Sequence, residues 1–305
     1  MVRAGAGDAP APALLCPPEN PGPGPDGKAP RKPAWLKVTL PGGEQARRVA
    51  GVLRGQRLHT VCHGARCPNR GECFAAGHLT FMLLGENCTR GCAFCGVSRG
   101  APLPVDADEP RRLAAAVAAL ALRGVVLTSV TRDDLPDGGA AHWSAAIAAV
   151  RAAAPGVPVE ALIPDFAGRA GALAEIIAAR PEVAAHNLEM VPRLYPALRP
   201  RSDYPRSLAV LRALAGAGLA VKTGLMLGLG ERADEVRALL GDARAAGATR
   251  VTIGQYLQPR RECVPVTRYV HPDEFARWQE EAGGLGFTHA EAGPLVRSSY
   301  HAFRR

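Results

Sequence analysis

Aromatic residues and lysine are scarce in this chain of 305 residues. Aromatics make up only 5% of it, so its core must be mainly aliphatic. Only four of its 37 basic residues are lysines, and no compact basic run or aromatic stripe accompanies the charge, which argues against nucleic-acid binding. No apolar run reaches 18 residues, and the N-terminus lacks the apolar stretch of a secretory signal. We therefore expect a cytoplasmic protein with no nucleic-acid or membrane partner.

What is present has the balance of a globular protein. Hydrophobic residues account for 47% and charged residues for 21%, which excludes a largely disordered or collagen-like chain. The 37 basic residues exceed the 28 acidic ones and give a net charge of +9, spread along the whole chain. This charge indicates a moderate attraction to an acidic partner. The length fits one large domain or two small ones.

Proline and glycine crowd the N-terminus and set the first boundary. Residues 1–30 contain eight prolines and five glycines without any periodicity, so we predict a disordered tail over residues 1–32. An N-terminal extension follows over 33–78, the main body over 79–290, and a C-terminal segment over 291–305.

Within the main body, short apolar runs alternate with Ala- and Leu-rich segments of helical period. The runs predict strands at 79–84, 124–130, 158–163, 183–189, 220–226 and 251–256. The segments predict helices at 108–123, 140–153, 168–179, 205–217, 231–246 and 272–284. Six such units in succession imply parallel strands joined by right-handed crossovers.

Two folds have this alternation, an open doubly wound sheet and an incomplete TIM-like barrel. The G-x-G-x-x-G turn that would favour the open sheet is absent after the first strand, where the chain reads ENCTRGCAFC. Polar residues also end the other predicted strands, as catalytic residues do in barrels: Thr128, Ser129, Asn187, Glu189, Lys222, Thr223 and Gln255. We predict an α/β fold, a partial TIM-like (β/α)6 barrel.

Six of the eight cysteines lie within 34 residues, in two triads. In a chain without an export signal, such clustering indicates metal binding rather than disulfides. Cys88, Cys92 and Cys95 have the spacing C-x3-C-x2-C, and three thiolates in one loop suit a 4Fe-4S cluster whose fourth iron has no protein ligand. The alternative is structural zinc, which needs four ligands and usually a second C-x2-C pair.

The other triad, Cys62, Cys67 and Cys73, has the spacing C-x4-C-x5-C. Pro68, Gly64 and Gly71 predict a tight loop rather than a helix for this segment, and such a loop can wrap a compact metal centre. A zinc site shared between both triads is the alternative, but their unlike spacings favour two separate centres. Cys16 and Cys263 lie outside the triads, and we expect free thiols there.

The C-x3-C-x2-C spacing resembles that of the radical S-adenosylmethionine (SAM) superfamily. Both triads together, with the passages around them, resemble the lipoyl synthase family. The resemblance extends over residues 31–303 and rests on RKPAWLKV, ARCPNRGEC, FMLLGENCTRGCAFC, LTSVTRDDLPDGG, LIPDF, HNLEMVPRLYP, LMLGLGE, TIGQYLQP and GPLVRSSYHA. The residues after the first cysteine, His63 and Gly64, depart from the family's acidic or amide types, and Met190 replaces a threonine.

The resemblance implies an enzyme that inserts two sulfur atoms, at C6 and C8, into an octanoyl chain on a lysine of a lipoyl carrier domain. Its cofactors would be SAM and two 4Fe-4S clusters. Cys88, Cys92 and Cys95 would hold the catalytic cluster to which SAM binds. Cys62, Cys67 and Cys73 would hold an auxiliary cluster that donates the sulfur. The fourth auxiliary ligand is carried by the RSSY motif, and we assign it to Ser299, with Ser298 as the fallback.

The remaining implications concern SAM and the partners. We expect SAM to contact Thr128, Ser129, Asn187, Glu189, Gln255 and Arg297, although capping and loop hydrogen bonds explain the first five equally well. The carriers would be the E2 subunits of 2-oxoacid dehydrogenases and the glycine cleavage H protein, the electron donor a ferredoxin or flavodoxin, and the enzyme a monomer. The alternative function is another two-cluster radical-SAM sulfur inserter, such as a methylthiotransferase acting on RNA.

Two polar motifs have simpler interpretations. Asp133, Asp134 and Asp137 resemble a carboxylate metal site, but Pro136 and Gly138 favour a turn with helix-capping acids. The glycines at 224, 228 and 230 lack dinucleotide-binding spacing, so we expect them to admit SAM close to the backbone or to form a turn.

Overall fold

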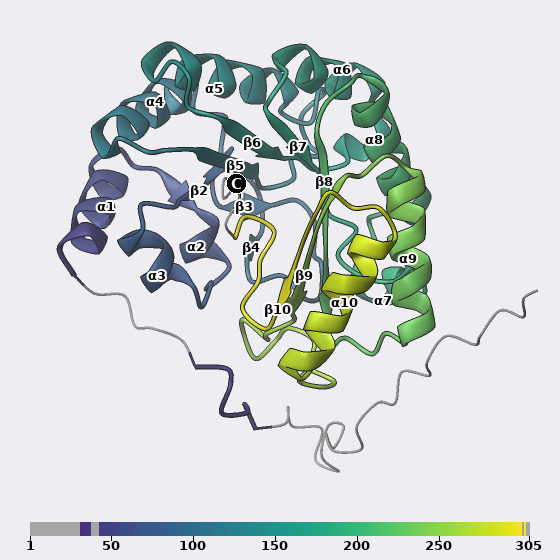
Figure 1. Cartoon of the computed structure of the whole chain (residues 1–305). Coiled ribbons are helices and arrows are strands. Elements are labelled where there is room, and N and C mark those ends of the chain that lie inside the picture. The colour runs from purple at the N-terminus through teal and green to yellow at the C-terminus, as the bar shows by residue number, and fades with distance from the viewer. Residues whose placement is uncertain (1–30, 38–42, 301, 303–305) are drawn as a thin grey trace, which may run out of the picture.

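A computed structural model of the chain describes residues 31–37, 43–300 and 302. The predicted disordered tail lies outside the described residues except for Arg31 and Lys32, and so does Cys16. The rest forms a curved sheet that is covered on its outer face by helices (Figure 1).

The sheet has eight strands, and seven of them run parallel. In spatial order they are β1 (His59–Thr60), β2 (Thr80–Leu83), β5 (Val125–Ser129), β6 (Val159–Leu162), β7 (Val183–Ala185), β8 (Val221–Leu227), β9 (Arg250–Gln255) and β10 (His289–Gly293). Only β1 is antiparallel, on the outer edge of β2. Most residues of the parallel strands from β2 to β9 are buried, which explains their nearly continuous apolar character.

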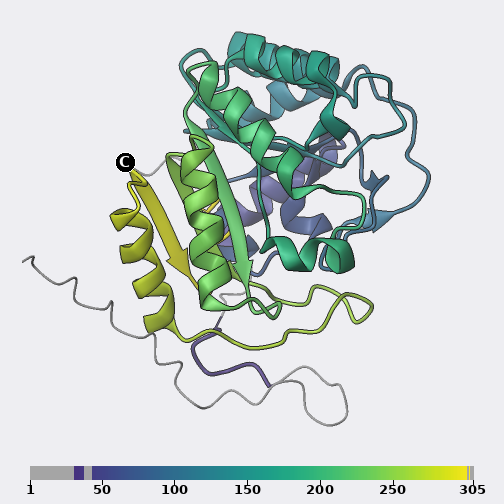
Figure 2. The same cartoon turned by 90° about the vertical axis from the view of Figure 1, so that its right-hand side faces the viewer.

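Helices follow the strands and pack on the outside of the sheet (Figures 1 and 2). They are α4 (Glu109–Leu120), α5 (Ala140–Ala153), α6 (Ala170–Ala179), α8 (Tyr204–Gly216), α9 (Ala233–Ala245) and α10 (Pro272–Gly284), with the short α7 (Tyr195–Leu198) between β7 and α8. Local sequence fixes their starts: Asp203 accepts from the Arg206 amide at 3.2 Å and so caps α8. In the described part of the chain, no helix is both long and apolar enough to span a membrane.

The predicted α/β partial barrel is confirmed, and each of the six predicted strand-helix units is present. The structure adds a strand at each edge that the sequence pattern does not reveal. β1 is only two residues long, and β10 (HAEAG) consists of small and polar residues. The predicted boundary between the main body and the C-terminal segment, after residue 290, falls within β10, so the two parts share this strand.

The N-terminal extension packs at the β2 edge of the barrel. It contains α1 (Gly43–Gly55), α2 (Val61–Gly64) and α3 (Arg70–Ala75). Ala46, Val49 and Leu53 form the buried face of α1. The first cysteine triad lies on α2, α3 and the turn between them, beside the barrel interior. The prediction of a loop rather than a helix is therefore wrong for Cys62 and Cys73, because Gly64 and Gly71 are accommodated within two short helices, and it holds only for the turn with Cys67.

The second triad follows β2. Its loop runs between two short paired strands, β3 (Asn87–Cys88) and β4 (Ser98–Arg99). These strands form a small sheet of their own, separate from the barrel.

The C-terminal segment crosses the barrel interior from β10 towards β2 (Figure 1). Two glycines on neighbouring strands make room for it. A Cβ atom on Gly254 would lie 2.2 Å from the Val296 carbonyl oxygen, and one on Gly224 would lie 3.1 Å from Ser298 Oγ. Gly224 therefore admits the C-terminal segment, while Gly228, with a φ of +100°, forms a turn.

Candidate active site

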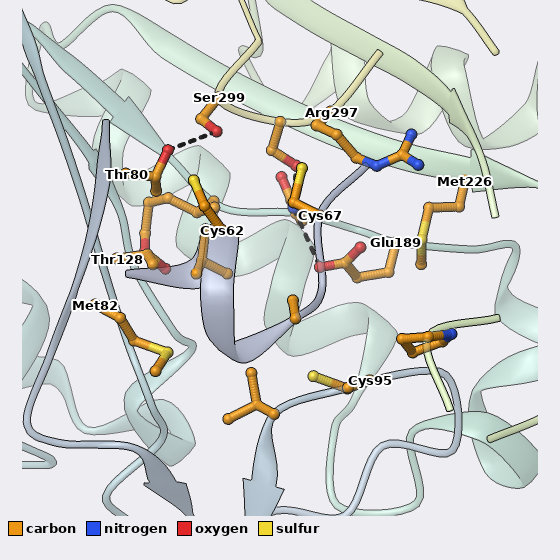
Figure 3. A pocket seen from close by; sticks show the side chains of 18 of the residues that line it. Cys62, Cys67, Thr80, Met82, Cys95, Thr128, Glu189, Met226, Arg297 and Ser299 are labelled. Atoms are coloured by element: carbon orange, nitrogen blue, oxygen red, sulfur yellow. Dashed lines mark hydrogen bonds between the residues drawn. The ribbon is translucent and has the colours of Figure 1, made fainter. Parts of the chain in front are cut away.

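A cavity of about 540 Å³ opens into the barrel interior, and every residue predicted to bind a cofactor or a metal lines it. Lys222 and Thr223, the other polar residues predicted at strand ends, do not line it; both are buried, and Lys222 Nζ pairs with Glu160 at 2.9 Å. Both cysteine triads face it, although they lie on opposite sides of β2 in the sequence (Figure 3). The C-terminal segment closes another side with Arg297, Ser298 and Ser299. Three stretches of chain that are far apart in sequence thus converge on one cavity.

Backbone amides and one arginine surround the sulfurs of the second triad. Cys88 Sγ accepts hydrogen bonds from the amides of Arg90 and Thr131, each at 3.4 Å. Burial raises the pKa of Cys95 to about 12, and it raises that of Cys92 although Arg199 opposes the shift. Thiols in this state are protonated, so metal binding must release their protons.

Arg90 fixes the loop of the second triad to the barrel. Its Nε and Nη2 atoms donate to the two oxygens of Asp133 at 2.8 and 2.9 Å, and Nη2 lies 2.6 Å from Asp165 Oδ1. The guanidinium is almost fully buried, and its two carboxylate partners raise its pKa against the effect of burial. A charge in this position holds the cysteine loop against the ends of β5 and β6.

The turn after β5 has the structure that its prolines and glycines predict. Asp137 caps α5, because its carboxylate accepts from the amides of Gly139 at 2.8 Å and Ala141 at 2.9 Å. Asp134 pairs with Arg132 at 2.8 Å. The capping interpretation is thus confirmed for Asp137, while Asp133 forms an ion pair with Arg90 instead.

The first triad is tied to the C-terminal segment at two points. Asn69 Nδ2 donates to the Leu295 carbonyl at 2.5 Å, and the Tyr300 hydroxyl donates to Glu72 Oε1 at 2.9 Å. Burial raises the pKa of Cys62 and of Cys73 to about 12. These two thiols, like Cys92 and Cys95, must therefore lose their protons when they bind a metal.

His63, beside Cys62, engages neighbours other than the cysteines. Its ring packs edge-on against Phe74 with centroids 5.7 Å apart, and its Nδ1 lies 3.1 Å from Thr60 Oγ1. Cys263 is a free, buried thiol, as expected, and its Sγ lies 3.5 Å from the Cys95 carbonyl oxygen.

The two serines of the RSSY motif have different partners. Thr80 Oγ1 donates to Ser299 Oγ at 2.8 Å. Asn187 Nδ2 donates to Ser298 Oγ at 2.6 Å and to Glu189 Oε1 at 3.1 Å. Ser299 is therefore held by β2, next to the first triad, and Ser298 is held by the residues that follow β7.

The other polar residues predicted to contact SAM are engaged to different degrees. Thr128 Oγ1 donates to the Leu162 carbonyl at 3.1 Å, and Ser129 Oγ accepts from Trp143 Nε1 at 3.2 Å. The Gln255 amide donates to three backbone carbonyls and accepts from the Val270 amide at 2.8 Å. All of its polar atoms are thus in use, and its visible role is to hold the loop before α10.

Two residues of this wall escaped the sequence analysis. Arg199 is buried, and Nη1 donates to the carbonyl of Leu188 at 3.3 Å, but Nε has no hydrogen-bond partner among the described residues. His186 is only 2% exposed, its Nδ1 lies 2.9 Å from the Ile163 carbonyl, and its Nε2 likewise lacks a described partner. The position of His186 next to Asn187 was the only signal in the sequence.

The buried His186 predicts a loss of stability in acid. Burial lowers its pKa from 6.5 to about 4, so the unfolded chain binds a proton between these values that the folded chain does not. Stability from this group is complete above pH 6.5 and declines as the pH falls towards 4, by about 3 kcal/mol at most. Urea unfolding at about pH 7 and about pH 4.5 should show a smaller pH effect in His186→Gln than in the parent. An equal effect in both would contradict this prediction.

The comparisons with known proteins first define the class. A family model described as the radical SAM superfamily matches residues 82–243. The crystal structure of methylornithine synthase superposes with a TM-score of 0.54 at 12% identity, over 82% of this chain and 78% of that chain, which supports the fold alone. The fold and the cysteine loop after β2 thus define a radical SAM enzyme.

Closer relatives narrow the class. Residues 22–67 match the N-terminal domain of lipoyl synthase of the radical SAM family. Lipoyl synthase of Trichlorobacter lovleyi is 53% identical over 90% of this chain and 98% of its own, and that of Chlorobium limicola is 51% identical over 89% and 94%. The chain belongs to the lipoyl synthase family. It is therefore a sulfur-inserting enzyme that uses SAM and 4Fe-4S clusters, and nothing in the comparisons favours a methylthiotransferase.

Proposed function

We propose that the cavity converts a protein-bound octanoyl-lysine into a lipoyl group by insertion of sulfur at C6 and C8. The observation that carries this proposal is that both cysteine triads and Ser299 line one cavity. Val61, Met82, Val126 and Leu162 add an aliphatic lining to the same cavity, which suits an alkyl chain. A reactive carbon radical also needs such shielding from water.

The two triads would divide the chemistry. Cys88, Cys92 and Cys95 would hold the catalytic cluster, and Cys62, Cys67 and Cys73 would hold the auxiliary one. The donor sets fit, since each triad offers three thiols that face the cavity within one short segment. When bound, the catalytic cluster supplies the electron that cleaves SAM, and the auxiliary cluster supplies the sulfur. Arg90 would keep the catalytic loop in position, because its ion pairs with Asp133 and Asp165 join that loop to the barrel.

Ser299 would be the fourth ligand of the auxiliary cluster. Its hydroxyl is bound by Thr80, which lies beside Cys62 in Figure 3, so Ser299 lies on the side of the first triad. The competing Ser298 hydroxyl is held instead by Asn187. A hydroxyl is a harder and weaker iron ligand than a thiolate, which suits a cluster that must be dismantled to release sulfide.

We assign the SAM contacts to the polar wall between the triads. Glu189 is a half-buried carboxylate whose pKa is raised by burial, and Arg199 lies close enough to oppose that shift. An ammonium and a carboxylate of one amino acid match this pair of opposite charges. Asn187, Thr128, Ser129 and Arg297 line the neighbouring surface, and Gln255 would act by shaping the adjacent loop.

The partners follow from the substrate. Octanoylated lipoyl domains of E2 subunits and of the glycine cleavage H protein would present the lysine, and the net charge of +9 favours acidic carriers. A ferredoxin or flavodoxin would supply electrons to a monomeric, cytoplasmic enzyme.

Metal loading and product analysis test the function together. Anaerobic reconstitution with iron and sulfide should give about eight irons per chain, as two 4Fe-4S clusters require. Incubation with an octanoylated carrier, SAM and a reductant should then produce a carrier whose mass has gained two sulfurs in place of two hydrogens. A chain that binds only zinc, or one cluster at saturation, would contradict the proposal, and so would modification of RNA in place of the carrier.

A further inference from the structure

Thr80, the first residue of β2, lies next to two of the proposed auxiliary ligands. It lies beside Cys62 in Figure 3, and both residues line the cavity. Its side-chain hydroxyl donates to Ser299 Oγ at 2.8 Å. In Figure 3 the Thr80 and Ser299 oxygens point towards one another beside Cys62. One residue thus joins the first triad to the C-terminal segment, over a separation of 219 residues in the chain.

The sheet holds Thr80 in a fixed orientation. Thr80 is 5% exposed and pairs with Val126 of β5, while its neighbours Leu79 and Phe81 are buried in the core. A β-branched side chain in a strand has few accessible rotamers. The backbone of β2 therefore fixes the direction of the Thr80 hydroxyl. This hydroxyl can hold Ser299 in place although the two residues are far apart in the chain.

The contact is specific to one serine of the RSSY motif. Ser298 Oγ lies beside Gly224 of β8 and is bound by Asn187, on the far side of the segment from Thr80. Arg297, the preceding residue, donates to the Val296 carbonyl at 2.6 Å. Thr80 thus selects which of two adjacent hydroxyls stands next to Cys62.

We propose that Thr80 is a positioning residue of the auxiliary site, which holds Ser299 beside Cys62 and donates a hydrogen bond to its oxygen when that oxygen binds iron. This inference rests on the proposed function, because it assumes the auxiliary cluster. A hydrogen bond to an anionic oxygen is stronger than one between neutral groups, so the contact gains strength when Ser299 acts as a ligand. Thr80 would thereby retain the weakest ligand of the cluster until sulfur transfer begins.

Three variants separate this role from simple packing. Thr80→Val removes the hydroxyl but keeps the shape and the backbone amide, and Thr80→Ser keeps the hydroxyl. Thr252→Val is the matched control, since Thr252 is a buried strand threonine outside the cavity lining whose hydroxyl contacts a carbonyl only at 3.5 Å.

The readouts are the rate at which a chelator removes iron from the fully reconstituted enzyme and the Mössbauer signal of the auxiliary cluster. We expect Thr80→Val to lose auxiliary iron about tenfold faster or more, and the signal of the serine-bound iron to change. Thr80→Ser should return to within about twofold of the parent, and Thr252→Val should match the parent.

Parental iron release and an unchanged Mössbauer signal in Thr80→Val would overturn the inference. So would equal losses in Thr80→Val and Thr252→Val, which would indicate packing alone. Failure of the proposed function itself is recognised separately, because the parent would then bind no second cluster.

Discussion

Ser299→Ala is expected to cleave SAM at nearly the parental rate while forming no measurable lipoyl product. The substitution removes the serine oxygen that accepts from Thr80 but leaves all six cysteines of the cavity in place. Under the proposed assignment, SAM cleavage would depend on the second triad alone, whereas sulfur transfer would need a complete auxiliary cluster. Quantifying 5′-deoxyadenosine and the modified carrier by mass spectrometry in one reaction measures both steps.

Two further variants make this prediction specific. Ser298→Ala loses the hydroxyl that Asn187 binds and should keep measurable lipoyl formation, because it leaves the contact between Thr80 and Ser299 intact. Cys88→Ala removes a proposed ligand of the catalytic cluster and should abolish SAM cleavage. If Ser298→Ala and Ser299→Ala exchanged their behaviour, the fourth ligand would be Ser298.

Gly254→Ala is expected to give the same separation of activities without altering any residue that binds a cofactor. The added methyl group would lie 2.2 Å from the Val296 carbonyl oxygen and 3.2 Å from its carbon. Both are backbone atoms, so relief requires the C-terminal segment to shift. A displacement near 1 Å can reduce a rate by about 100-fold, and overpacking of this kind costs about 1–3 kcal/mol of stability. Lipoyl formation should therefore collapse, while SAM cleavage continues.

Gly241→Ala is the matched control for that variant. Gly241 lies within α9, and a Cβ atom there would meet nothing within 4 Å. Alanine at such a helix position stabilises by roughly 0.5–1 kcal/mol. Thermal unfolding and product formation should show this variant to be as active as the parent. Full lipoyl formation by Gly254→Ala would mean that the segment need not lie against β9 during catalysis.

The sequence predicts the barrel well and identifies the two cysteine triads, because both are local patterns. Each strand-helix unit has its own periodicity, and each triad lies within a few turns of chain. The pairing of Thr80 with Ser299 is different, since it joins two hydroxyls that are 219 residues apart. Threonine in a strand is ordinary, and nothing around Thr80 marks its partner.

Gly254 and His186 escaped prediction for related reasons. A glycine within the strand VTIGQY suggests that another group lies close to the backbone, but the sequence does not identify that group. In the structure it is the Val296 carbonyl. A histidine at the end of an apolar strand does not reveal that its Nε2 lacks a described partner. β10 was missed because HAEAG lacks the apolar alternation of a strand, although it pairs with β9 along its whole length.

The groove that receives the C-terminal segment exists only after β8 and β9 have formed, because its walls are Gly224 and Gly254. The contacts of that segment with Thr80 and with the segment of the first triad span 219 to 228 residues, so we expect them to form late in folding. Before they form, the C-terminal segment does not yet close the cavity that the three thiols line. We therefore expect the auxiliary metal centre to be loaded before the C-terminal segment closes the cavity. The order in which the metal is bound and the chain closes would then follow from the topology of the fold.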